Sequence, residues 1–376
     1  MKNKQAIVIG AGIVGLATAR ALSLKGFSVK VFDRTQQAVG ASIRNFGMVW
    51  PIGQPEGKMY NRAMRSRQIW QETCEAAGIW HEAAGSLHLG YHADEMQVLT
   101  ELNEIFNQQG RKVSLLSKAE ITQKYDSVNP QNLIGGLYSP EELIVDPREA
   151  IAKIPAYFTE QFGIEFHWGK CVSYVADQTV YIGNEEEHEA DIIFVCSGQD
   201  FETLYPEIFS AIPITKCKLQ MMRLVTQPDN WRIGTSLCGG LSLIHYNSFK
   251  TAPSLNALKE RYQNEMSDYL DWGIHVMVSQ NGRGELTIGD SHEYGLTFDP
   301  FDKEFINEMI LDYLHQFVHF KDWSLLETWN GIYPKLTNGE TDIFMSPEAG
   351  VYILNGLSGA GMTLSFGLAE EVIETI

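Results

Sequence analysis

The stretch Gln5-Ala-Ile-Val-Ile-Gly-Ala-Gly-Ile-Val-Gly15 decides the fold of this chain. Its first five residues form an apolar, β-rich run typical of a strand, and the glycine turn follows at once. Residues 16–25 are typical of a helix, and residues 27–32 of a second strand that ends at Asp33. A strand, a glycine turn, a helix, a strand and a carboxylate in this order predict a dinucleotide site in an α/β fold.

Each part of this motif has a physical task. Gly10 permits the tight turn, Gly12 lets the backbone approach a pyrophosphate at the positive end of the helix, and Gly15 lets helix and strand pack closely. Asp33 is expected to accept a hydrogen bond from a ribose hydroxyl. The motif alone does not separate NAD from FAD. The cofactor contacts predicted here are Gly10, Ala11, Gly12, Ile13, Val14, Gly15, Asp33 and Arg34.

Composition excludes several classes of function. The formal net charge is −18, which repels polyanions, so no nucleic-acid partner is expected. The length of 376 residues is enough for two domains. Five widely spaced cysteines without a C-x-x-C pair favour a reducing cytoplasm and indicate neither a disulfide framework nor a metal site. The apolar run after Lys4 is similar in composition to a secretory signal, but its glycine spacing favours the nucleotide site. No run of the sequence reaches the roughly 18 consecutive apolar residues that a membrane-spanning helix needs.

The C-terminal end repeats the strand, glycine turn and helix. Residues 351–355 read as a buried strand, and Gly356-Leu-Ser-Gly-Ala-Gly-Met-Thr363 opens a helix that continues through Glu371. One dinucleotide does not need two such turns for its phosphates. The second helix N-terminus is therefore expected to face another negative group, and a reduced flavin ring is such a group.

Five motifs in order resemble the flavoprotein oxidases typified by D-amino-acid oxidase, glycine oxidase and sarcosine oxidase. They are the N-terminal glycine turn, residues 40–45, residues 145–147, residues 190–198, and residues 329–334 followed by the C-terminal glycine turn. The resemblance covers nearly the whole chain and implies a discontinuous Rossmann-type FAD-binding domain interleaved with an antiparallel-sheet α+β substrate domain. By this division, residues 1–83, 145–212 and 325–376 form the FAD-binding domain, and residues 84–144 and 213–324 form the substrate domain.

The resemblance also implies further FAD contacts. The sarcosine branch attaches its flavin to a cysteine near the motif at residues 329–334, and no cysteine lies between Trp329 and the C-terminus here, so the FAD is expected to be non-covalent. The further residues expected to contact FAD are Ser42, Arg44, Asn45, Val172, Ser197, Gly198, Gly331, Gly356, Ser358, Gly359, Gly361, Met362 and Thr363.

Departures from the family bear on the substrate. Gly331-Ile-Tyr333-Pro334 stands where relatives that oxidise α-amino acids have Gly-x-Arg-Pro, so a bidentate carboxylate clamp is replaced by one donor. An anion could instead be recognised by Arg44, by Arg223, or by His245 and His292. The branch associated with aminophosphonate breakdown is the most similar. The candidate catalytic residues are Tyr333, His292, Arg44, Asn45, His245 and Tyr246.

The expected activity is FAD-dependent oxidation of the C–N bond of a small amine, with anionic, aminophosphonate-like and N-methylated amines as candidates. The product would be an imine that hydrolyses to an aldehyde or keto product. Thr287 stands where sarcosine oxidases carry an oxygen-activating lysine, so the electron acceptor is molecular oxygen or another carrier. The alternatives are a flavin-dependent hydroxylase, an NAD-dependent dehydrogenase or a non-enzymatic nucleotide-binding module. The oligomeric state is not predicted.

Local patterns predict elements between the motifs. A helical stripe begins at Met59 and ends at Gly78, and a second amphipathic helix covers residues 305–317. Residues 275–280 and 285–289 flank Asn281-Gly282, which predicts a hairpin with a primed turn.

Overall fold

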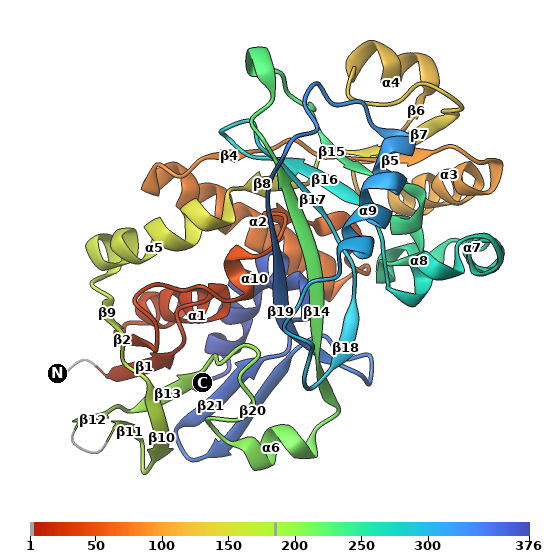
Figure 1. Cartoon of the computed structure of the whole chain (residues 1–376). Coiled ribbons are helices and arrows are strands. Elements are labelled where there is room, and N and C mark those ends of the chain that lie inside the picture. The colour runs from red at the N-terminus through yellow and green to blue at the C-terminus, as the bar shows by residue number, and fades with distance from the viewer. Residues whose placement is uncertain (1–3, 184–185) are drawn as a thin grey trace.

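The computed structural model describes residues 4–183 and 186–376. In that part, the N-terminal motif enters a sheet of six strands that are parallel except for one edge strand (Figure 1). In spatial order the strands are β20 (Ile343–Glu348), β21 (Val351–Asn355), β13 (Ile192–Val195), β1 (Gln5–Ile9), β2 (Ser28–Asp33) and β9 (Glu165–Trp168).

Alternating side chains give this sheet two buried faces. Ala6 and Val8 of β1 belong to one hydrophobic cluster, and Ile7 and Ile9 belong to another on the opposite face. One cluster includes the buried residues of the helices α1 (Ile13–Leu24), α2 (Lys58–Ala77), α5 (Pro147–Phe162) and α10 (Gly361–Glu374). The other includes residues of α6 (Pro206–Ala211) and of a three-stranded sheet of β10 (Val172–Ala176), β11 (Thr179–Ile182) and β12 (Glu186–Glu189).

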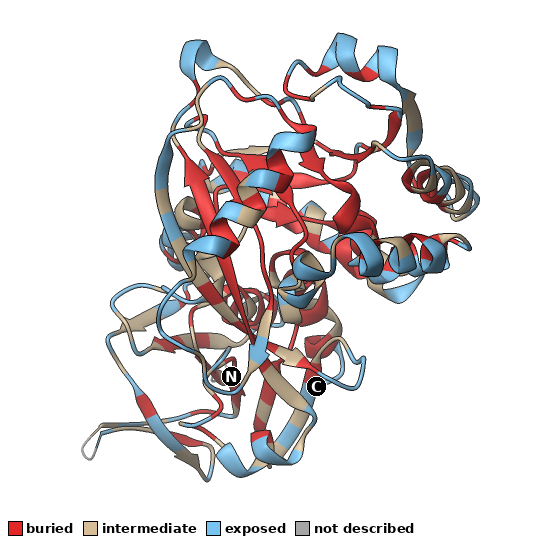
Figure 2. Ribbon diagram, turned by 45° about the vertical axis from the view of Figure 1, so that its right-hand side comes forward, coloured by how far each residue is buried: buried red, intermediate tan, exposed pale blue. Residues whose placement is uncertain are grey.

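The second large sheet is antiparallel except where β15 pairs with β5. Its path in space is β18 (Glu293–Gly295), β14 (Ile214–Leu224), β17 (Leu286–Gly289), β16 (Met277–Gln280), β15 (Ser236–Cys238), β5 (Ser86–Gly90), β7 (Gly135–Ser139) and β6 (Ser114–Ser117), with β19 (Leu325–Leu336) also paired to β14. Around it lie α3 (Ala93–Gln108), α4 (Lys118–Lys124), α7 (Leu255–Glu265), α8 (Ser267–Asp271) and α9 (Glu304–Phe317). A small sheet is formed by β3 (Met48–Val49), β8 (Leu143–Val145) and β4 (His81–Glu82). Figure 2 shows that the central strands are buried and that exposed residues lie on the outer sides of the helices.

The long pair β14 and β19 connects the two halves of the molecule. Their register runs from Ile214 opposite Leu336 to Leu224 opposite Leu325. In Figure 1 the pair extends from the half that contains β1 and α10 to the half that contains β15–β17. The predicted division places β14 in the substrate domain and β19 in the FAD-binding domain, and these boundaries stay a prediction.

The structure confirms the elements that carry the fold. Strands β1 and β21 have the predicted bounds, and Gly78 ends α2 in the left-handed conformation. Helix α1 begins at Ile13, three residues before the predicted start. The prediction of a primed turn at Asn281-Gly282 is wrong. The hairpin forms, but Gln280 pairs with Leu286, so residues 281–285 connect the two strands. The Asn281 side chain accepts hydrogen bonds from the N–H groups of residues 283 and 285, which stabilises the longer loop.

Two general expectations can be compared with the structure. All five cysteines are free. Among the described residues, none of the helices is long and apolar enough to cross a bilayer.

Asp146 caps α5, and its loss should weaken the fold. Its carboxylate accepts hydrogen bonds from the N–H groups of Arg148 (3.0 Å) and Glu149 (3.4 Å), and Pro147 occupies the first helical position. We expect Asp146→Ala to lower the free energy of unfolding by about 1 kcal/mol, measured by urea denaturation. Asp146→Asn should retain most of the stability, because asparagine also caps helices well. Equal losses in the two variants would contradict a capping role.

Candidate active site

A cavity of about 1130 Å³ extends from the N-terminal glycine turn to residues of the antiparallel sheet. It lies where the carboxyl ends of β1, β13 and β21 meet, which is where open α/β sheets bind ligands. Its volume exceeds that of a pocket for a drug-sized ligand, so it can hold a large cofactor together with a small substrate.

The N-terminal glycines are required by close packing. Gly10 has a φ of +102°, and a Cβ there would lie 2.4 Å from the carbonyl oxygen of Cys196. A Cβ on Gly15 would lie 1.8 Å from the carbonyl oxygen of Gly10. Gly12 lines the cavity and offers α1 no capping side chain, and the first turn of α1 has no acidic residue. The N–H of Ile13 donates to the Ser42 hydroxyl (2.9 Å), and the positive end of α1 faces the cavity, where it favours a ligand's phosphates.

The carboxylate of Asp33 supports the glycine turn. Its Oδ2 accepts a hydrogen bond from the N–H of Ala11 (2.9 Å), and its Oδ1 accepts from the N–H and hydroxyl of Thr35. Asp33 lines the cavity, and a carboxylate has lone pairs left for a ribose hydroxyl. Its neighbour Arg34 also lines the cavity and forms an ion pair with Asp200.

The C-terminal glycine turn is fixed to several elements. Asn355 donates a hydrogen bond to the carbonyl of Gly198 (2.9 Å), which joins the turns that follow β21 and β13. The indole N–H of Trp70 donates to the carbonyl of Met362 (2.7 Å), and the N–H of Trp50 donates to the Thr363 hydroxyl (3.0 Å). Like α1, helix α10 has no capping side chain and no acidic residue in its first turn.

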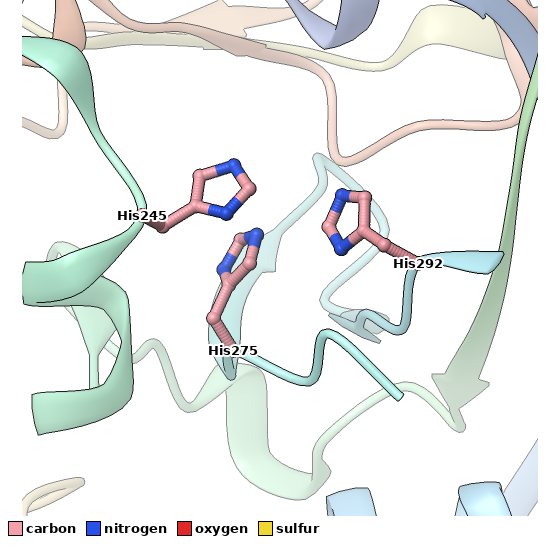
Figure 3. A group of neighbouring side chains, drawn as sticks. All are labelled: His245, His275 and His292. Atoms are coloured by element: carbon pink, nitrogen blue, oxygen red, sulfur yellow. The ribbon is translucent and has the colours of Figure 1, made fainter. Parts of the chain in front are cut away.

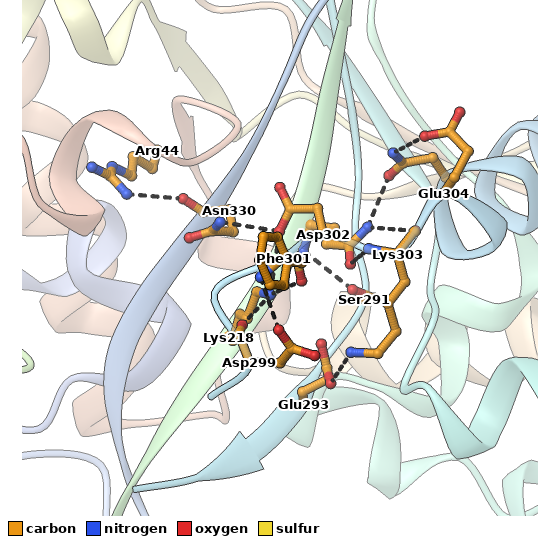
Figure 4. A network of polar contacts seen from close by, with 12 residues as sticks. Arg44, Lys218, Ser291, Glu293, Asp299, Phe301, Asp302, Lys303, Glu304 and Asn330 are labelled. Atoms are coloured by element: carbon orange, nitrogen blue, oxygen red, sulfur yellow. Dashed lines mark hydrogen bonds and ion pairs between the residues drawn. The ribbon is translucent and has the colours of Figure 1, made fainter. Parts of the chain in front are cut away.

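Arg44 and Asn45 hold their own loop. Arg44 donates hydrogen bonds to the carbonyls of Val39 (2.9 Å) and Asn330 (3.1 Å), and Asn330 donates to Asp302, so the loop is tied to β19 (Figure 4). The Asn45 amide donates to the carbonyls of residues 41 and 42. Both residues line the cavity, and their catalytic role stays a prediction.

Three imidazoles meet at the cavity (Figure 3). One ring nitrogen from each of His245, His275 and His292 lies within 4.8 Å of the others, and the rings of His245 and His275 are 3.8 Å apart. The carboxyl of Asp290 joins them, 3.2 Å from His275 Nε2 and 3.9 Å from His292 Nε2. His292 Nδ1 lies 2.9 Å from the carbonyl of Gly273, which can only accept, so its Nε2 carries the free lone pair.

His275, His292 and Asp290 are buried, whereas His245 is exposed. Burial is the main cause that lowers the pKa of His292 to about 4 and the pKa of His275 well below its usual range, which favours their uncharged forms. The same loss of hydration raises the pKa of Asp290 well above its usual range. Among the described residues, His275 Nδ1 and Asp290 Oδ1 are buried without a hydrogen bond, although Asp290 Oδ1 lies 3.2 Å from His275 Nε2.

Tyr333 lies between the cluster and the C-terminal turn. Its side chain is 8% exposed and packs with Cys217 and Leu219, and a Cβ built on Gly359 would lie 3.6 Å from its hydroxyl. Burial first, and the charges of neighbours such as Asp290 second, raise the pKa of Tyr333 well above its usual range, so its phenol is a hydrogen-bond donor. Tyr246 donates a hydrogen bond to the sulfur of Met277 (2.9 Å).

The structure gathers most of the predicted site residues. All six candidate catalytic residues line the cavity, as do all the predicted FAD contacts except Ala11, Gly15 and Gly356. Arg223, a candidate for anion recognition, does not line it and pairs with Glu285 instead. Sequence reasoning missed His275 and Asp290 as site residues, although the predicted hairpin brings them together: their backbones exchange two hydrogen bonds.

A family model described as "FAD dependent oxidoreductase" matches residues 5–375. The chain belongs to this family. The nucleotide is therefore FAD, and the NAD-dependent and non-enzymatic alternatives fall away. Gly12 at the cavity and the N-terminus of α1, which has no acidic residue in its first turn, fit the phosphates of FAD, and the turn from Ser358 to Thr363 fits a group that becomes negative on reduction.

Solved structures share the whole fold of this oxidoreductase. Glycine oxidase from Bacillus cereus is 16% identical with a TM-score of 0.77, over 99% of this chain and 94% of that one. L-Proline dehydrogenase from P. horikoshii is 20% identical with a TM-score of 0.78, and the match covers 99% of this chain and 92% of that one. Among curated proteins, the bifunctional protein ThiO/ThiG of a Nostoc species is 27% identical over 59% of this chain and 34% of its own length. The chain thus spans about a third of the length of that relative.

Gly12→Val should abolish FAD retention, because the new side chain would occupy the approach of the pyrophosphate. We expect the purified variant to be colourless in its absorbance spectrum and to rebind little added FAD. Gly295→Val is the matched control, since Gly295 lies outside the cavity and a Cβ there meets its nearest atom at 3.4 Å. Full flavin occupancy in Gly12→Val would contradict the N-terminal site.

Proposed function

We propose that this FAD-dependent oxidoreductase oxidises the C–N bond of a small amine. The observation that carries the proposal is the group of acceptors beside Tyr333: three imidazoles and the carboxyl of Asp290. An amine must lose its extra proton to solvent before it can give up a hydride, and neutral imidazoles with free lone pairs favour the neutral amine by accepting its N–H hydrogen bonds. The candidate amines are anionic, aminophosphonate-like or N-methylated.

The chain's own residues bind and orient the substrate in this proposal. FAD, when bound, supplies the two-electron acceptor. Acceptors of the cluster formed by the three histidines and Asp290 bind the N–H groups of the amine, while the Tyr333 phenol donates to an electronegative atom of the substrate. The carbon loses a hydride and the nitrogen loses a proton, which leaves an imine. Water hydrolyses the imine to an aldehyde or keto product and a free amine.

The names of similar proteins support an amine substrate, but they also include substrates that carry a hydroxyl instead. Glycine oxidase and L-proline dehydrogenase are named for amine-bearing substrates. L-2-Hydroxyglutarate dehydrogenase of Arabidopsis thaliana, 28% identical over 37% of this chain, and an L-α-glycerophosphate oxidase are named for hydroxyl-bearing ones. The acceptors at His275 and Asp290 favour the amine, because an amine nitrogen offers more N–H hydrogens than a hydroxyl offers O–H hydrogens.

Three finer statements belong to the same proposal. The FAD is held without a covalent bond, since the described region from Trp329 onward contains no cysteine. The acceptor is molecular oxygen or another carrier. A cytoplasmic location is consistent with five free cysteines.

Anaerobic addition of candidate substrates tests the proposal. The panel is glycine, sarcosine, D-alanine, 2-aminoethylphosphonate and its N-methyl form, with 2-hydroxyglutarate and glycerol 3-phosphate as hydroxyl-bearing counterparts. We expect one amine to bleach the visible flavin band. Bleaching by a hydroxyl compound alone would contradict C–N oxidation.

Tyr333→Phe should weaken substrate use while flavin content is retained, because the ring still packs on Leu219. Loss of one hydrogen bond to a charged group predicts a fall in kcat/KM of about ten- to a hundredfold. Tyr352→Phe, which removes a hydroxyl outside the cavity, should leave kcat/KM unchanged. Identical kinetics in both variants would remove Tyr333 from the substrate site.

A further inference from the structure

Lys335 is a cavity-lining cation without a carboxylate partner. Among the described residues, its ammonium makes one polar contact, to the hydroxyl of Tyr294 (3.0 Å), and it also lies over that ring. Of the other cations at the cavity, Arg34 and Lys170 form ion pairs, Arg44 donates to backbone carbonyls, and Lys250 is exposed. In a chain with a formal charge of −18, a cavity-lining cation without an ion pair among the described residues indicates an anionic ligand.

Strand register places two phenols beside this cation. Cys217 of β14 lies opposite Tyr294 on one side and opposite Tyr333 on the other, so the three side chains share one face of the sheet. Lys335 is two residues beyond Tyr333 on β19 and therefore points to the same face. All three donors line the cavity. Together they present one ammonium and two hydroxyls to the same space.

The histidine cluster continues this row. The ring of His292 stacks on Tyr294 with centroids 6.3 Å apart, and His275 stacks on His292 at 5.2 Å. Burial is the main cause that lowers the pKa of His275 and of His292, and the positive charge of Lys335 lowers both further. A divalent cation among the imidazoles would be repelled by the same charge, whereas an anion would be attracted.

We propose that Lys335, with the hydroxyls of Tyr294 and Tyr333, binds the acid group of the substrate. The inference rests on the proposed function and deepens it: the substrate is an amine with a carboxylate or phosphonate, and its two ends meet different groups. The donors on β18 and β19 bind the acid group of the substrate. His275 and Asp290 bind its amine nitrogen. Lys335 thus supplies the positive charge that Tyr333 does not.

The test uses the holoprotein and three variants. The probes are acetate, inorganic phosphate and methylphosphonate, and their dissociation constants are measured from the change in the visible spectrum of the oxidised flavin. Lys335→Met should weaken the binding of the preferred anion about tenfold or more, and Lys335→Arg should restore most of it. Lys321→Met is the matched control, because Lys321 lies outside the cavity and pairs with Asp126. The probe that binds best separates a carboxylate from a phosphonate.

Three results would overturn the proposal. One is equal anion binding by Lys335→Met and the unaltered protein. Another is an equal loss in Lys321→Met, which would reflect overall charge rather than a site. The third is anion binding that disappears when EDTA removes divalent cations, which would assign the anion to a metal held by the histidines.

The anion site and the amine oxidation can fail separately. If no amine bleaches the flavin but Lys335→Met still weakens anion binding, the anion site stands without the proposed reaction. If an amine bleaches it and the KM of an acid-bearing amine is the same in Lys335→Met, the reaction stands without the anion site. A KM that rises for 2-aminoethylphosphonate or glycine but not for ethylamine supports both.

Discussion

The close approach of backbone to backbone at the first glycine turn is the constraint on which the site depends. Gly10 leaves no room for a Cβ against the carbonyl of Cys196, and Gly15 leaves none against Gly10 itself. These contacts bring α1 against β1 and bring β1 beside the end of β13. The positive N-terminus of α1 can then face the cavity. A side chain at either glycine would displace the helix end that the phosphates of FAD need.

The substrate part of the cavity depends on a second arrangement, the pairing of β14 with β19. Because this long pair joins both halves of the molecule, residues of the antiparallel sheet reach the ends of the parallel strands. Tyr333 thereby lies near the turn at Gly359, and Lys335 lies near Tyr294. A cofactor held by one sheet and a substrate held by the other can meet in one cavity.

Electrostatics in this cavity follow from burial. Removing the histidines from water favours their uncharged forms and also favours the protonated form of Asp290. The cluster therefore carries little charge of its own, although it contains four titratable groups. Lys335 remains as a positive group near its edge, which gives the cavity a polarity suited to a substrate with an amine at one end and an acid group at the other.

The sequence by itself determined the nucleotide half of the protein. The contact of Gly15 with Gly10 and the cap at Asp146 act through local sterics and local hydrogen bonds, and the strand at 351–355 follows from its apolar run, so short stretches of sequence were sufficient to predict them. The placement of His275, Asp290 and Lys335 at one cavity was decided by the tertiary structure alone. These residues come from a hairpin and from β19, and their distances depend on strand register and on a five-residue connection where a two-residue turn was expected. Register is fixed by packing over the whole sheet, which no short stretch of sequence encodes.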